Sequence, residues 1–90
     1  MAKAEISWKR VTEEGEKLQV YAQHVSRKWI FYAREKRFDQ WQEIPDPPLE
    51  DWIELLDAVR RRINRRLLRP EEEGRVLKSI RERFPDAKVS

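Results

Sequence analysis

We predict an α+β fold for this chain: an antiparallel meander of three strands, or four if residues 40–44 form one, followed by two helices packed on one face of the sheet. Three observations predict it. Apolar and polar residues alternate through the first half, prolines gather at residues 45–48, and beyond them apolar residues recur every three or four positions. With 90 residues, 39% of them hydrophobic, we expect a single domain over residues 1–90, with the meander at 5–44 and helices at 47–68 and 70–84.

Three segments of the first half are typical of strands. Residues 5–11 and 17–25 alternate apolar and polar side chains, and residues 12–16, which include Gly15, supply the turn between them. Residues 28–34 are rich in aromatic and β-branched side chains, and Ser26 and Arg27 form a two-residue turn before them. Residues 40–44 leave two alternatives open: a short fourth strand, or a loop whose Trp41 covers the edge of the core.

The second half predicts two amphipathic helices. Asp46 is the expected N-cap of the first, with Pro47 at its first helical position, and its apolar residues step by three and four from Leu49 to Leu67. The second helix follows Pro70, has an acidic first turn and ends before Pro85. The predicted core is Trp8, Trp29, Phe31, Trp52, Leu56, Val59, Ile63, Ile80 and Phe84.

The composition argues against catalysis and against bound cofactors. There is no cysteine, two glycines and one histidine, His24, which alternation places near the end of a strand. Cysteine-based zinc sites, thiol nucleophiles and glycine-rich phosphate loops are therefore excluded. The acids between residues 35 and 46 alternate with cations and have no metal-loop spacing. We expect a cytoplasmic protein that is not an enzyme, holds no cofactor or metal and, lacking an apolar run of about 20 residues, does not enter the membrane.

The net charge of +3 is concentrated in one segment, since residues 60–69 hold six arginines and no acid. On a helix that continues to residue 68, Arg61, Arg62, Arg65 and Arg69 form one ridge about 100° wide. Guanidinium groups in such a row suit phosphates and give little sequence preference. We therefore expect nucleic-acid backbone binding by this ridge, with Lys28 and Arg34 as secondary contacts.

The same charges also have a purely structural interpretation. The first helix has acids at its start and arginines at its end, which the helix dipole favours, and Asp57 stands four residues before Arg61. The three glutamates at 71–73 neutralise part of the arginine cluster if the second helix folds back.

The sheet offers an alternative site. Alternation places Tyr21, Ile30 and Tyr32 on the face away from the helices, together with Lys28 and Arg34. Such a surface is a base-stacking platform or a protein-docking patch, unless its cross-strand contacts only stabilise the sheet. The competing function is thus a protein-interaction module, which binds an acidic partner or a second copy of itself and no nucleic acid. This assignment depends on the register, because a shift of one residue exchanges the two faces.

Overall fold

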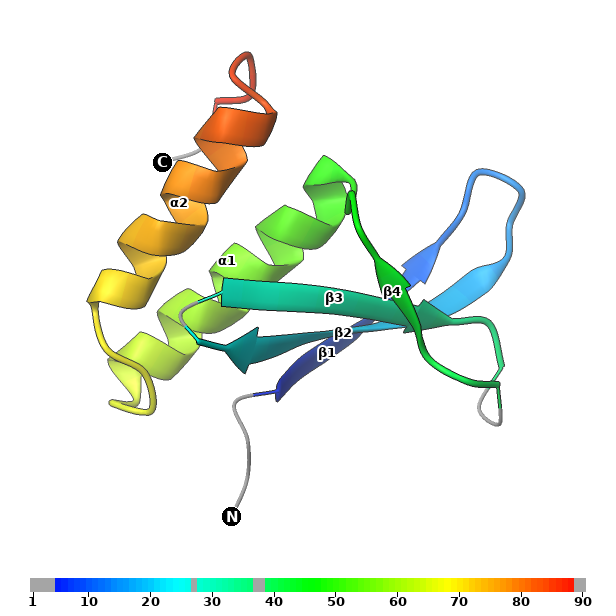
Figure 1. The fold of residues 1–90 in the computed structure, drawn as a ribbon, viewed down its shortest axis with the longest axis horizontal. Helices are drawn as coiled ribbons and strands as arrows, with labels where there is room; N and C mark the ends of the chain where they lie inside the picture. The colour runs from blue at the N-terminus through cyan, green and yellow to red at the C-terminus, as the bar shows by residue number, and fades with distance from the viewer. Residues whose placement is uncertain (1–4, 27, 37–38, 89–90) are drawn as a thin grey trace. The chain divides into compact units, whose positions relative to one another are not determined.

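The computed structural model describes residues 5–26, 28–36 and 39–88. It confirms the α+β prediction, with an antiparallel sheet in the order β1-β2-β3-β4 followed by two helices (Figure 1). The elements are β1 (Glu5–Val11), β2 (Lys17–Val25), β3 (Lys28–Arg34), β4 (Gln42–Ile44), α1 (Leu49–Asn64) and α2 (Glu71–Arg83). The chain divides into two compact units, Met1–Pro47 with the sheet and Pro48–Ser90 with the helices.

The strand register separates the sheet residues into a buried and a more open face. Trp8 pairs with Val20, and Ala22 pairs with both Ile6 and Phe31. Val20, Ala22, Ile6 and Phe31 are all at most 4% exposed, and the Trp8 ring meets Phe31 edge to face at 6.0 Å. Because side chains alternate along a strand, the residues between them lie on the other face.

The two alternatives for residues 40–44 are resolved in favour of a short fourth strand. β4 pairs antiparallel with β3, with Phe31 opposite Ile44 and Ala33 opposite Gln42. Trp41, immediately before β4, contacts Tyr21, so it lies on the more open face. The alternative in which Trp41 covers the edge of the core is therefore wrong.

The first two hairpin turns, between β1 and β2 and between β2 and β3, fall where the sequence predicts them. In the first, Gly15 has φ 86°, and its N–H donates to the carbonyl of Thr12 at 2.9 Å. In the second, Val25 pairs with Lys28, and Ser26 adopts φ 48°; Arg27 lies outside the described residues. Both turns thus use a residue in the left-handed region, as tight hairpins commonly do.

The start of α1 differs from the prediction. The helix begins at Leu49 and its N-cap is Pro48, which has extended backbone and makes no side-chain capping hydrogen bond. The assignment of Asp46 as N-cap and Pro47 as first helical residue is therefore wrong. The acids Glu50 and Asp51 lie in the first turn, where the positive end of the helix dipole favours them.

The end of α1 also differs, because the helix stops at Asn64 and not at residue 68. Arg66 has φ 60°. Its N–H donates to the carbonyl of Ile63 at 2.9 Å, and the N–H of Leu67 donates to the carbonyl of Arg62 at 2.8 Å. This pair of bonds is a Schellman motif. The motif reverses the chain and satisfies carbonyls that would otherwise lack donors at the helix end.

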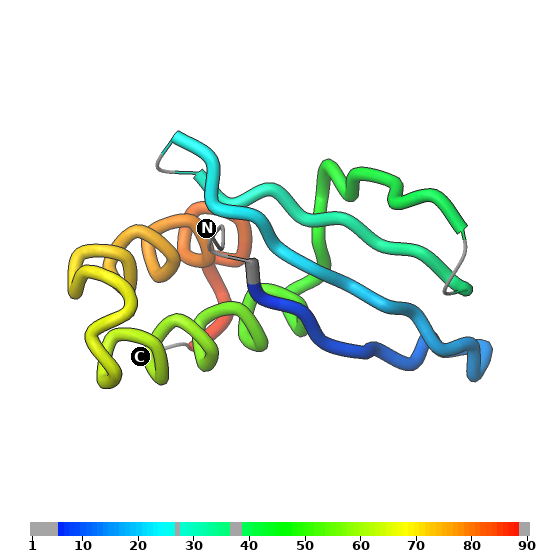
Figure 2. Tube along the Cα trace, turned by 90° about the horizontal axis from the view of Figure 1, so that it is seen from below, coloured from blue at the N-terminus to red at the C-terminus, as the bar shows by residue number. Residues whose placement is uncertain are grey.

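α2 begins and ends within one residue of its predicted bounds. The two helices run side by side in opposite directions, joined by the yellow segment (Figures 1 and 2). Of the predicted core, Phe31, Trp52, Leu56, Val59 and Ile80 are buried, whereas Trp8, Trp29, Ile63 and Phe84 are half-buried. No helix in the described part of the chain is long and apolar enough to cross a membrane.

Candidate functional site

The four arginines of the predicted ridge do not lie on one helix face. Arg61 lies on α1 and forms an ion pair with Asp57 at 2.5 Å, and Arg62 is half-buried and engaged within the chain. Arg65 is the C-cap residue, and Arg69 lies beyond the Schellman motif. Since the chain leaves the helical path after Asn64, the spacing that placed Arg65 and Arg69 in line with Arg61 no longer applies.

Acidic side chains neutralise part of the arginine cluster at residues 60–69, as the structural interpretation of these charges predicts. The Nε of Arg60 donates to Glu73 Oε2 at 2.7 Å, which links α1 to α2. Arg65, Arg66 and Arg69 remain exposed around the turn between the helices. The helical unit therefore retains a small cationic turn in place of a continuous ridge.

The sheet, in contrast, brings its predicted residues together. Tyr21 lies opposite Tyr32, and their rings stack with centroids 4.8 Å apart and planes 16° from parallel. Ile30, Lys28 and Arg34 lie on the same face by the register of β2 and β3. Tyr21, Ile30 and Tyr32 are half-buried and Lys28 is exposed.

Trp41 belongs to this face, although the sequence did not place it there. Its ring meets Tyr21 nearly at right angles, with centroids 4.6 Å apart, and the guanidinium carbon of Arg34 lies 4.2 Å from its centroid. We call Tyr21, Tyr32, Arg34 and Trp41 the cation–aromatic cluster. Its members come from β2, β3 and the segment before β4, so only the formed sheet assembles it.

Arg34 is held in this cluster by neutral groups. Its Nε donates to Gln19 Oε1 at 2.7 Å, and its Nη1 makes a long contact of 3.5 Å with the main-chain carbonyl of Asp39. Among the described residues, no carboxylate forms an ion pair with Arg34. Its guanidinium is therefore held by neutral acceptors and not by a directly paired carboxylate.

A hollow of about 410 Å³ adjoins the cluster on the β1 side of the sheet. The register places Lys9, Gln19 and Arg34 in one row across three strands. These three residues, together with Ser7 and Trp41, line the hollow, and no described carboxylate does. We call it the basic hollow. It offers two cations, an amide, a hydroxyl and an indole to a ligand.

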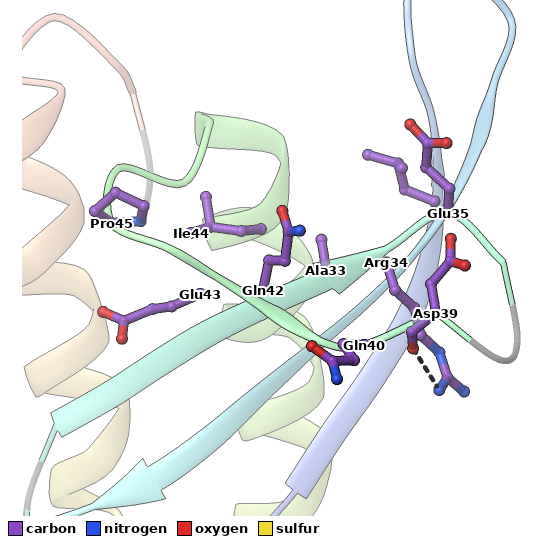
Figure 3. Close-up of a pocket in the computed structure, with 10 residues that line it drawn as sticks. Ala33, Arg34, Glu35, Asp39, Gln40, Gln42, Glu43, Ile44 and Pro45 are labelled. Carbon is purple, nitrogen blue, oxygen red and sulfur yellow. Dashed lines mark hydrogen bonds between the residues drawn. The ribbon is translucent and has the colours of Figure 1, made fainter.

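A second hollow, of about 690 Å³, lies on the β4 side and has the opposite charge. Its lining includes Arg34 but also three carboxylates, with Glu35 and Asp39 at one end and Glu43 farther along β4 (Figure 3). Within the part of the chain that the structure describes, no three His, Cys, Asp or Glu side chains are grouped to hold a metal ion. The hollow on the β1 side is thus basic, and the hollow on the β4 side, which Leu18, Ala33 and Ile44 of the buried face also line, is acidic.

His24, the single histidine, is half-buried and lies on the other face of the sheet. Its ring stacks on Trp29, with centroids 4.6 Å apart. This contact gives His24 a packing role remote from the cation–aromatic cluster.

No protein-family model, curated protein or solved structure matches the chain.

Proposed function

We propose that the protein is a non-catalytic, cytoplasmic binding module for single-stranded nucleic acid, and that the face of the sheet with the cation–aromatic cluster makes the contact. One observation carries this proposal. Arg34 lies over Trp41 beside the stacked Tyr21–Tyr32 pair, with Lys9 across a hollow that no described carboxylate lines. Aromatic rings that stack on bases, combined with cations that attract phosphates, are the usual means of binding single strands.

The aromatic side chains favour a single strand over a duplex. A base within a duplex is covered by its neighbours above and below, so a protein ring stacks on it only after the base leaves the helix. Single-stranded bases expose their faces without that cost. The aromatic rings of this face therefore gain most from a strand that is already unpaired.

The charge distribution favours an anionic polymer and indicates where it crosses the sheet. Lys9 and Lys28 are exposed on the same face as Arg34. Glu43 lies opposite Tyr32 at the β4 side, where its carboxylate repels phosphate. The phosphates are therefore expected to follow the β1 side, past Lys9 and the basic hollow. The exposed Arg65 and Arg69 of the helical unit are proposed as secondary contacts for the phosphates.

The proposal is tested with a labelled single-stranded 12-mer, whose affinity is measured by fluorescence anisotropy at two salt concentrations. Binding should weaken steeply with salt, and Lys9→Ala should lower the slope of log K against log salt by about one. Lys78→Ala, which removes an exposed cation of α2, is the matched control and should change little.

Three results would contradict the proposal. Absence of binding at low salt removes nucleic acid as the ligand. A slope that responds to Arg65→Ala and Arg69→Ala, and not to Lys9→Ala, places the contact on the helical unit. Self-association that is insensitive to salt and abolished by Tyr32→Ala identifies the face as a protein-interaction surface.

A further inference from the structure

We infer that the basic hollow takes one unstacked base and prefers a base whose edge carries carbonyl oxygens, such as uracil or guanine, over cytosine or adenine. This inference rests on the proposed function and names the specificity of the same site. The juxtaposition behind it is that of Gln19, Lys9 and Arg34, which line one hollow and present mainly hydrogen-bond donors.

The orientation of the Gln19 amide follows from its partner. Arg34 has only donors, and its Nε lies 2.7 Å from the amide, so the oxygen of Gln19 must face the guanidinium. The amide nitrogen is then left with two N–H donors. Since Gln19 lines the basic hollow, this nitrogen is the group that it offers to a ligand.

The other polar groups of the hollow have the same preference. The ammonium of Lys9 and the guanidinium of Arg34 donate and never accept, and among the remaining described side chains of the lining the hydroxyl of Ser7 alone does both. The lining contains no described carboxylate to accept from an amino group. A ligand that brings acceptors satisfies these donors, whereas an exocyclic amine at the same place leaves them unpaired.

Base chemistry then separates the nucleotides. Uracil presents O4, and guanine presents O6 and N7, as acceptors, whereas cytosine and adenine present an amino group at the corresponding position. The indole of Trp41 supplies an aromatic wall for the ring of the base, and its contacts with Arg34 and Tyr21 fix that wall. At about 410 Å³, the hollow is within the size range of sites for small ligands.

The experiment compares octauridylate with octacytidylate, because these strands have the same backbone and differ only at ring positions 3 and 4. Anisotropy titrations at low salt should give octauridylate an affinity about tenfold higher. Gln19→Glu keeps the acceptor for Arg34 Nε but replaces the amide nitrogen with oxygen, so it should abolish this ratio. The ratio of the two affinities is the readout, because the added negative charge weakens the binding of both strands alike.

Gln23→Glu is the matched control. Gln23 lies four residues after Gln19 on β2, on the same face of the sheet, and is not among the residues that line the basic hollow, so this variant adds the same charge and should leave the ratio unchanged. Equal binding of the two strands by the unmodified protein overturns the inference while the proposed function stands. A preference that survives Gln19→Glu overturns it too. If neither strand binds at low salt, the proposed function fails as well.

Discussion

Arg34 and Trp41 form a cation–π pair in which the guanidinium carbon lies 4.2 Å from the ring centroid. Arg34 is the last residue of β3, and Trp41 precedes the first residue of β4, so the pair joins the two ends of the β3–β4 connection. The same guanidinium is hydrogen-bonded to Gln19 of β2. The pair thus sets the position of the indole beside the basic hollow.

A double-mutant cycle on this pair should reveal a measurable coupling. Arg34→Met keeps the apolar stem and Trp41→Leu keeps an apolar side chain. Comparison of the double variant with the two single variants then isolates the interaction between the charge and the ring, because the lost hydrogen bond to Gln19 cancels. We expect a coupling free energy of about 0.5–1 kcal/mol, typical of a cation–π contact at the protein surface. Urea unfolding of the four proteins measures it. Strictly additive losses would show that the contact contributes nothing to stability.

The two glycines should respond to alanine in opposite directions. Gly15 has φ 86° and Gly74 lies inside α2, and in neither place would an added Cβ meet an atom within 4 Å. The backbone conformation alone therefore determines the effect of each substitution. Gly15→Ala should lower the free energy of unfolding by about 1 kcal/mol, and Gly74→Ala should raise it by about 0.5–1 kcal/mol. Thermal unfolding of the two variants measures both shifts. A gain from Gly15→Ala would contradict the left-handed turn.

Arg66→Gly should stabilise the protein although it removes a large side chain. Arg66 occupies the left-handed position of the Schellman motif with φ 60°, where glycine is the usual residue. Relief of the Cβ strain should add about 0.5–1 kcal/mol to the free energy of unfolding. Arg65→Gly is the control, because Arg65 has φ −91° and no such strain to relieve. Equal effects of both variants would argue against the motif.

Two arginines of the helical unit should differ in their contribution to stability. Arg75 forms an ion pair with Glu72, whose side chain is 6% exposed, whereas Arg61 pairs with Asp57, whose side chain is 61% exposed. Loss of a donor costs more when its partner is screened from water. Arg75→Ala should therefore lower the free energy of unfolding by about 1 kcal/mol, and Arg61→Ala by less than about 0.5 kcal/mol. The reverse order in chemical denaturation would contradict this assignment.

The alternation of apolar and polar residues was sufficient to predict the three longer strands, because in a half-buried strand every second side chain faces the core and must be apolar. Val20 and Ala22 are fully buried while their neighbour Tyr21 is not, which is the alternation visible in the sequence. The short β4 was ambiguous, since three residues carry too little pattern to separate a strand from a loop. Its pairing with β3 is a tertiary fact.

The end of α1 could not be read from composition. The left-handed position of a Schellman motif is usually occupied by glycine, which can be recognised in a sequence, but here Arg66 adopts that conformation. The apolar spacing continues to Leu67, which is 62% exposed and does not belong to the helix. An arginine-rich stretch with helical spacing therefore predicted a ridge that the chain reversal breaks.

The sequence by itself determined the order of strands and helices, the sheet face that carries Tyr21, Ile30 and Tyr32, and the segment in which positive charge accumulates. These properties depend on local alternation and on neighbours three or four residues apart, which a single chain displays directly. Only the tertiary structure decided which charges are available and which rings meet. Trp41, Lys9 and Gln19 join Arg34 through strand register, and long-range pairing of this kind leaves no local signal in the sequence.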